Sequence, residues 1–197
     1  MFSLSKLSPS ITDMIRFDHS HVLVTFHQYT GTAKTSVKQA LAETICDALD
    51  IHATLEEEIF YPAMRRLDNS AVLQKSEPEH IEMRRLISEL RQTKATDARH
   101  DELLHDLIRD VMHHMADEET VLLPQAERLL SKDRLNELGA QMTSRRIELL
   151  TPKAGKIAKN TAVGFSGSTT AIVVGLAGAL VAARFMSRES PELSKRH

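Results

Sequence analysis

Apolar residues recur every three or four positions along most of this 197-residue chain, which is the spacing of helices that bury one face. Polar turns divide the pattern into successive segments at about residues 11–30, 35–67, 71–93, 98–130 and 132–150. Ser10 and Ser131 stand where N-caps are expected, and Gly31 stands where the first helix should stop. After a polar lead-in at residues 1–9, the pattern predicts an all-α fold. Residues 10–130 form an up-down-up-down four-helix bundle, and residues 131–150 add an amphipathic helix.

Prolines fall inside three of the predicted helices. Pro62 and Pro124 should kink or loosen the last turns of the second and fourth helices, because proline lacks the N–H that continues the helix. Pro78 has two interpretations. It either breaks the third helix locally or is the first residue of that helix, after Ser76 and Glu77.

One stretch of the sequence occurs twice, as HATLEEEIFYPAMRRL at 52–67 and as HMADEETVLLPQAERL at 114–129. Both copies contain a His, a Glu four residues later, a second Glu, a Pro and a closing Arg-Leu. A separation of four residues puts His52 with Glu56, and His114 with Glu118, on one helix face. A single pair of this kind is usually solvated. Its recurrence with the same neighbours favours a metal half-site in each copy.

The other two predicted helices each place one histidine in an apolar stripe. His19 lies in line with Ile15 and Val22, and His80 lies in line with Met83 and Ile87. A lone histidine on an apolar face is more often a core residue than a ligand, but these two would face the duplicated motifs. The bundle interior would then receive six candidate metal ligands, listed here in chain order: His19, His52, Glu56, His80, His114 and Glu118.

The remaining histidines are assigned to other places. His105 is expected to be solvated because it falls opposite His114, and His100 because it lies too far along the helix axis. His21 is expected to be structural or exposed, because it lies about 200 degrees round the helix from His19. His27 is a weak candidate for a position behind a ligand. His113 lies next to His114, but only His114 keeps the spacing of the repeat.

Composition excludes several classes of protein. With 25 basic and 27 acidic residues the chain is nearly neutral, so no nucleic-acid surface is expected. The only cysteine is Cys46, which excludes an internal disulfide and disfavours thiolate metal sites. The N-terminus lacks the apolar run of a secretory signal. We therefore expect the bundle to be cytoplasmic. Imidazole and carboxylate without thiolate suit iron, manganese or zinc, and carboxylates on facing helices suit a bridged pair of metals.

These motifs resemble the hemerythrin-like, HHE cation-binding family. The resemblance covers about residues 10–130 and rests on Asp18-His19, on Glu79-His80 and on the two His-x-x-x-Glu-Glu motifs with their trailing prolines. It implies a four-helix bundle with a non-haem, oxo-bridged pair of irons. It also implies that the six candidate residues are the ligands and that Glu56 and Glu118 are the bridges. Manganese or zinc is the less favoured metal. Members of the family carry or sense dioxygen, and others are tied to nitric oxide, peroxide or iron handling.

The chain departs from the oxygen carriers of this family at two positions. Arg84 stands where they have a second histidine in the third helix, and Glu118 stands four residues after its His where they have an Asp at five. Loss of one histidine leaves the metals more open, so sensing or redox reaction is favoured over reversible oxygen carriage. Glu57, Glu119 or Tyr29 would weaken this inference by filling a coordination position.

Three functions stay open on the sequence alone. The first is a module that binds or senses dioxygen, nitric oxide or redox state. The second is a diiron enzyme acting on peroxide or nitric oxide, with Glu57, His113 and Tyr61 as candidate proton donors. The third is a scaffold in which any divalent ion tightens the bundle.

The C-terminal part of the chain differs in composition from the bundle. Residues 151–160 are predicted to be a basic linker, and residues 161–184 an apolar helix long enough to cross a membrane. The alternatives are a helix buried in a dimer or an apolar tail lying on the bundle. Ala171, Gly175 and Ala179 form a small-residue face through which a homodimer could pack. Residues 185–197 are a polar tail.

Overall fold

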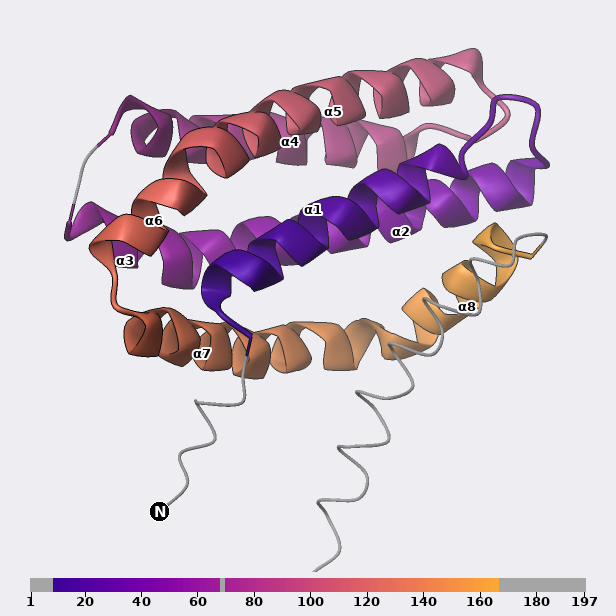
Figure 1. Cartoon of the computed structure of the whole chain (residues 1–197). Helices are drawn as coiled ribbons and strands as arrows, with labels where there is room; N and C mark the ends of the chain where they lie inside the picture. The colour runs from indigo at the N-terminus through magenta and orange to yellow at the C-terminus, as the bar shows by residue number, and fades with distance from the viewer. Residues whose placement is uncertain (1–8, 68–69, 167–197) are drawn as a thin grey trace, which may run out of the picture.

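The computed structural model describes residues 9–67 and 70–166, and within these ranges every regular element is helical (Figure 1). The elements in chain order are α1 (Ile11–His27), α2 (Thr35–Leu55), η2 (Glu56–Phe60), α3 (Tyr61–Arg65), α4 (Ala71–Gln92), α5 (Ala98–Asp117), η3 (Glu118–Leu122), α6 (Leu123–Leu129), α7 (Lys132–Leu150), η4 (Thr151–Lys153) and α8 (Ala154–Gly164).

Four long helical rods form the bundle. The rods are α1, the continuous run from α2 through η2 to α3, α4, and the continuous run from α5 through η3 to α6. They pack side by side, and α7 with α8 lies along the outside of α1 and α2 (Figure 1). This is the helical bundle with an added amphipathic helix that the hydrophobic pattern predicts.

The helix starts follow from local capping. The Ser10 hydroxyl accepts a hydrogen bond from the Asp13 N–H, and the Ser131 hydroxyl accepts one from the Arg134 N–H. Each bond satisfies one of the free N–H groups of a first turn. The structure therefore confirms both predicted N-caps. α1 ends at His27, three residues earlier than predicted, because the backbone tightens into i to i−3 hydrogen bonds beyond it.

The two prolines of the repeat follow short π-helical segments. The Tyr61 N–H bonds to the Glu56 carbonyl, and the Leu123 N–H bonds to the Glu118 carbonyl, five residues back instead of four. The predicted loosening before Pro62 and Pro124 thus takes the form of a wider helical turn, a feature often found at functional sites. Pro78 neither breaks nor starts a helix, since α4 runs through it and the residue is exposed.

The apolar interior of the bundle consists of two clusters. One includes Leu41, Ile45 and Leu107, and the other includes Ile15, Leu55 and Leu122. The six candidate ligands occupy helix positions between the residues of the two clusters, for example His19 between Ile15 and Val22. A polar belt therefore crosses the core at mid-height, and packing on both sides fixes its side chains.

The predicted linker at residues 151–160 is wrong. Residues 151–164 are helical, and α8 packs against α2. Lys153 and Lys156 form ion pairs with the buried carboxylate of Asp47, and Phe165 is buried in the bundle core. These lysines look like a solvated linker in the sequence because their partner lies more than a hundred residues earlier.

The predicted membrane helix at 161–184 falls mostly outside the described residues, which end at 166. The described part of it, residues 161–166, is the end of α8 and the turn that carries Phe165. Among the helices that the structure describes, none has the length and apolarity to span a bilayer. The small-residue face at Ala171, Gly175 and Ala179 also lies beyond the described chain.

The docking of α7 on the N-terminal segment depends on a glycine. A Cβ atom at Gly139 would overlap the Pro9 carbonyl oxygen and come within 3.1 Å of the Ile11 nitrogen, whereas a Cβ at Gly155 in α8 would meet nothing within 4 Å. We expect Gly139→Ala to lower the free energy of unfolding by about 2 kcal/mol. Gly155→Ala should raise it by about 0.5 kcal/mol, because alanine favours the helix. Thermal unfolding of the metal-free protein followed by circular dichroism tests both, and equal effects of the two changes would contradict this account of α7.

Candidate metal centre

The structure brings together all six residues predicted as ligands. Each is at most 5 % exposed, and together they come from α1, α2, η2, α4, α5 and η3. The imidazole Nε2 atoms point inward at the two carboxylates. The separations are 3.3 Å from His19 Nε2 to Glu118 Oε2, 3.2 Å from His52 Nε2 to Glu56 Oε2, 3.4 Å from His80 Nε2 to Glu56 Oε2 and 3.5 Å from His114 Nε2 to Glu118 Oε2.

The candidate ligands divide into two groups that share Glu56. His19, His52, Glu56 and Glu118 form one group, and Glu56, His80 and His114 form the other; the candidate ligand atoms of each group lie within 4.8 Å of one another. Each group contains one pair of histidines, with ring centroids 4.9 Å apart for His19 and His52, and 4.7 Å apart for His80 and His114. Two ion positions with a carboxylate between them are the arrangement of a bridged metal pair.

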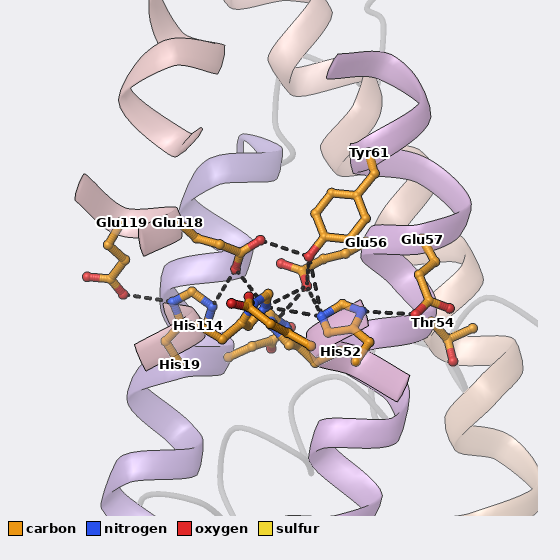
Figure 2. A network of polar contacts seen from close by, with 12 residues as sticks. His19, His52, Thr54, Glu56, Glu57, Tyr61, His114, Glu118 and Glu119 are labelled. Atoms are coloured by element: carbon orange, nitrogen blue, oxygen red, sulfur yellow. Dashed lines mark hydrogen bonds and ion pairs between the residues drawn. The ribbon is translucent and has the colours of Figure 1, made fainter. Parts of the chain in front are cut away.

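The outward nitrogen of each imidazole is held by a carboxylate from a neighbouring helix. The pairs are listed with their distances: His19 Nδ1 with Glu119 at 2.8 Å, His52 Nδ1 with Asp18 at 3.4 Å, His80 Nδ1 with Glu57 at 2.9 Å, and His114 Nδ1 with Glu79 at 2.8 Å. The first pair is visible in Figure 2, where the Glu119 side chain points to His19. An Nδ1–H that donates to a carboxylate leaves the Nε2 lone pair free for a metal, so these contacts select the tautomer that ligation needs.

Three of these four carboxylates are themselves held by cations. Arg146 donates two hydrogen bonds to Asp18, and Arg84 donates two to Glu57. Lys75 pairs with Glu79 at 3.4 Å. Two-pronged arginine contacts fix both oxygens of a carboxylate, so the orientation of the inner histidines is set by a further layer of charged side chains.

Tyr61 places a phenol inside the ring of ligands. Its hydroxyl oxygen lies 2.9 Å from Glu118 Oε1, 3.1 Å from Glu56 Oε2 and 3.3 Å from His80 Nε2, so the two carboxylates share its single proton (Figure 2). Burial and the charges of the two glutamates raise the pKa of Tyr61 well above its ordinary value. The phenol therefore keeps its proton at neutral pH and holds the two carboxylates toward each other.

Buried acids and imidazoles of the site shift one another's pKa values. Burial would raise the pKa of the Glu56 carboxyl, but the surrounding imidazoles, His52 first among them, hold it well below its usual range. Burial opposes protonation of His114, yet the nearby carboxylates, above all Glu118, raise the pKa of His114 to about 10. The pKa of His19 is raised in the same way against its burial. Without a metal, protons therefore provide the positive charge that the carboxylates require.

Unpaired polar atoms show that the residues fit a cation. Within the described chain, His19 Nε2, His52 Nε2, Glu56 Oε1 and Glu118 Oε2 are buried and make no hydrogen bond. A buried polar atom without a partner is costly. All four atoms belong to residues of the two ligand groups, and all are donors of lone pairs that Fe, Mn or Zn accept, so ligation of metal ions would satisfy them.

Other predictions about individual residues had mixed outcomes. Glu57 and Glu119, considered as replacements for the missing histidine, instead hold His80 and His19 from behind. Tyr29 lies away from this cluster and bonds to Asp101 and His100. The prediction that His100 is solvated is wrong, because the residue is 3 % exposed and its ring stacks on Tyr29.

The remaining assignments concern histidines on the helix surfaces. His105 and His113 are exposed, as the helical geometry predicts for His105. His113 therefore sits on the outer face of α5, and its role as a proton donor loses its structural support. His27 is exposed and bonds to the Leu23 carbonyl, so it is not behind a ligand. His21 is partly buried in α1.

Comparison with known proteins assigns the family. The model of the hemerythrin HHE cation-binding domain matches residues 10–126, which include every residue of the two ligand groups. The chain belongs to the hemerythrin HHE cation-binding domain family. The predicted family resemblance is thereby confirmed, and cation binding is the property that the family and the His/Glu cluster support together.

Two individual proteins add to this comparison. A solved HHE cation-binding domain-containing protein from Mycobacterium kansasii, a homologue of Rv2633c, has the same fold, with a TM-score of 0.64 and 18 % identity, covering 76 % of this chain and 93 % of that chain. A DNA nickase from Nostoc sp. (strain PCC 7120 / SAG 25.82 / UTEX 2576) is 26 % identical over 132 residues, which make up 67 % of this chain. The match spans 38 % of the nickase, well under half of its length.

Sequence reasoning missed the residues that orient the histidines across the bundle. The sequence motifs mark Asp18 and Glu79 only as neighbours of His19 and His80, and they do not include Arg146. A usable pattern was present for the first two, since an acid directly precedes the histidine in α1 and again in α4. No such pattern marks Arg146, because its partner Asp18 lies in a distant helix.

Metal binding by this family member should release protons. His114, with a pKa of about 10, is protonated at neutral pH in the metal-free protein, and a metal must displace that proton. We expect zinc affinity to rise as the pH increases from 6.5 to 8.5, by about tenfold per pH unit for each proton released. Isothermal titration calorimetry in two buffers with different ionisation enthalpies measures the number of protons.

The same pKa shift sets the pH dependence of stability. Because the folded-state pKa of His114 is raised, its protonation stabilises the metal-free protein below pH 6.5, and this stabilisation is lost as the pH rises toward 10. The zinc-loaded protein should instead become more stable over the range where binding tightens. Zinc binding that releases no proton at pH 7.5 would contradict this account.

Proposed function

We propose that this protein holds two iron ions in the belt of the bundle and uses them to bind or sense dioxygen, nitric oxide or redox state. The observation that carries the proposal is the pair of two-histidine groups joined at Glu56, with Glu118 reaching both His19 and His114. His19 and His52 would hold one ion, and His80 and His114 the other. Iron in such a site supplies redox chemistry and free coordination positions for a small ligand.

The donor set favours ions with open coordination positions over ions whose coordination is saturated by protein ligands. Four imidazoles and two carboxylates leave coordination positions open on two octahedral ions, because Arg84 occupies the position where a further histidine would be and pairs with Glu57 instead. Manganese and zinc fit the same donors. A zinc-filled site with no response to ligands would be a structural site, the third function that the sequence leaves open.

Burial restricts the ligand to small molecules. The six residues are nearly inaccessible to solvent, and the apolar clusters enclose the site on both sides. A diatomic gas or peroxide is compatible with such a site, whereas a larger substrate would require the helices to separate. The same enclosure lowers the local dielectric and strengthens the electrostatic interactions within the site.

Tyr61 favours a second candidate, a diiron enzyme acting on peroxide or nitric oxide. Nitric oxide reduction consumes protons, and peroxide disproportionation transfers them from one peroxide to the oxygen atoms of another. The Tyr61 hydroxyl is a protonated donor within 3.1 Å of both candidate bridges. The sequence offers Tyr61 as a candidate proton donor only because it is close in sequence to the candidate ligands. Its hydroxyl lies among them in the structure, which supports a proton-donating role in an enzyme.

We also propose, from the sequence, that the protein is anchored at a membrane and forms a homodimer. The apolar stretch beyond Ser166 would anchor the chain at a membrane with the bundle in the cytoplasm, and its small-residue face would support a homodimer. Both proposals rest on composition and spacing alone.

Metal content tests the proposed centre. Protein expressed in iron-rich medium should contain about two irons per chain and show the near-ultraviolet absorption of a ferric pair, which changes when nitric oxide or peroxide is added. His114→Ala should remove at least one iron per chain, because it deletes a ligand of one group. His113→Ala is the matched control, since its side chain is exposed on the same helix turn.

Elemental analysis and optical spectra decide the outcome. Less than about one iron per chain in the wild type would refute the diiron proposal. Unchanged spectra on addition of dioxygen, nitric oxide and peroxide would refute sensing and catalysis together and would leave the structural-site reading.

A Tyr61→Phe substitution separates the enzyme from the sensor. It removes the hydroxyl and preserves the ring that packs in the core. If the phenol donates a proton in turnover, peroxide consumption should fall by about 100-fold while two irons per chain remain. Steady-state oxygen evolution or peroxide loss, measured at equal iron content, gives the result; an unchanged rate would exclude the phenol as the donor.

A further inference from the structure

Arg146 connects a helix outside the family domain to the metal centre. The residue belongs to α7, whereas the family model ends at residue 126. Its Nη1 and Nη2 atoms lie 2.5 Å and 2.6 Å from the two oxygens of Asp18 in α1. Both side chains are largely buried, with exposures of 20 % for Arg146 and 13 % for Asp18. The contact therefore lies under the surface, between α7 and the bundle.

Asp18 passes this contact on to a candidate ligand. Its Oδ2 atom accepts from Arg146 and also lies 3.4 Å from His52 Nδ1. Of the four carboxylate contacts that orient the imidazoles, this is the longest. The orientation of His52 thus depends on where Asp18 is held, and Arg146 holds it at both oxygens.

The other orienting carboxylates differ in the source of their cation. Glu57 and Glu79 pair with Arg84 and Lys75, both from α4 and both inside the residues that the family model matches. Among the cation contacts described for these carboxylates, the one on Asp18 comes from the added helix. α7 therefore contacts the candidate ligand His52 through Arg146 and Asp18. Packing through Leu135, Leu138 and Met142 alone would only bury apolar surface.

Stability alone gives a weak reason for this arginine. Transferring a guanidinium and a carboxylate out of water costs free energy that their attraction only partly offsets. The Arg146 Nε atom, moreover, is buried without a hydrogen bond among the described residues. An apolar side chain would cover α1 at less cost, so the geometry of the carboxylate is the feature that arginine supplies.

We propose that Arg146 is a positioning residue for His52 and that it couples metal binding to the docking of α7 on the bundle. This inference rests on the proposed metal centre. Since coupling between two binding equilibria is reciprocal, whatever α7 docking adds to metal affinity, bound metal adds to α7 docking. Because α8 follows α7 in the chain and packs on α2, its position would also depend on whether metal is bound at the site.

Metal affinity of matched variants tests the positioning role. Arg146→Met should weaken zinc binding by about tenfold, the lower end of the range for residues that support a ligand from behind. Arg146→Lys keeps the charge but cannot hold both oxygens of Asp18. Its zinc affinity should lie between those of the wild type and Arg146→Met. Arg145→Met is the control, because Arg145 lies on the same helix and pairs with the exposed Glu58. This variant should bind zinc as tightly as the wild type does. Competition with a chromophoric chelator gives the affinities, and circular dichroism of the metal-free proteins reports folding.

Hydrogen exchange of the wild type tests the coupling without any substitution. Zinc should slow amide exchange in residues 140–150 of α7, and the slowing should be smaller in Arg146→Lys. Gly139→Ala, which displaces α7 without touching the ligands, should weaken zinc binding in the same direction.

The outcomes separate this inference from the proposed function. A wild type that binds no metal refutes the centre itself. A wild type that binds two zinc ions, with Arg146→Lys within twofold of its affinity and α7 exchange unchanged by zinc, refutes the coupling and leaves the centre standing. A variant that loses thermal stability but keeps its zinc affinity assigns Arg146 a structural role and overturns the proposal in the same way.

Discussion

The hydrogen bond from an imidazole Nδ1–H to a carboxylate is the interaction on which the centre depends. It occurs four times, and the four occurrences form a closed sequence around the bundle: Asp18 of α1 holds His52 of α2, Glu57 of η2 holds His80 of α4, Glu79 of α4 holds His114 of α5, and Glu119 of η3 holds His19 of α1. Each orienting acid is the sequence neighbour of a ligand on its own helix. A shift of one helix therefore disturbs its own ligand and the ligand of the next helix, so the site and the bundle are stabilised by the same contacts.

The site also has an approximate twofold repeat, and the two halves of the repeat differ next to the two central glutamates. Each helical hairpin supplies an acid-histidine pair, a second histidine, a glutamate that is a candidate bridge and an orienting glutamate, and each has a π-helical turn before its proline. One of the positions at which the two copies differ is the residue before the proline, which is Tyr61 in the first copy and Leu123 in the second. Only Tyr61 brings a hydroxyl to the carboxylates. The two candidate ion positions are consequently unequal, and the one that contains His80 lies beside the phenol.

Much of this structure follows from short-range patterns in the sequence. The helices, their serine caps and the six convergent ligands could be predicted because helical periodicity fixes which residues share a face, and a duplicated motif fixes which faces meet. The errors arise where the partner is distant. The sequence predicts a linker at Lys153 and Lys156 because their attachment to Asp47 cannot be inferred from spacing. The sequence predicts a solvated His100 because its neighbour Tyr29 lies in the segment after α1, far from it in the chain.

The distant contacts have a common consequence for how the added helices relate to the bundle. α7 and α8 are held by ion pairs to buried or half-buried acids, Asp18 for Arg146 and Asp47 for Lys153 and Lys156, in addition to apolar packing. An apolar contact tolerates sliding, but a paired buried charge does not, since separation leaves an unpaired charge in a low-dielectric environment. These helices are therefore held in one position relative to the ligands. That fixed position allows a change of charge at the centre, such as the exchange of protons for metal ions, to alter the energy of a helix that contributes no ligand.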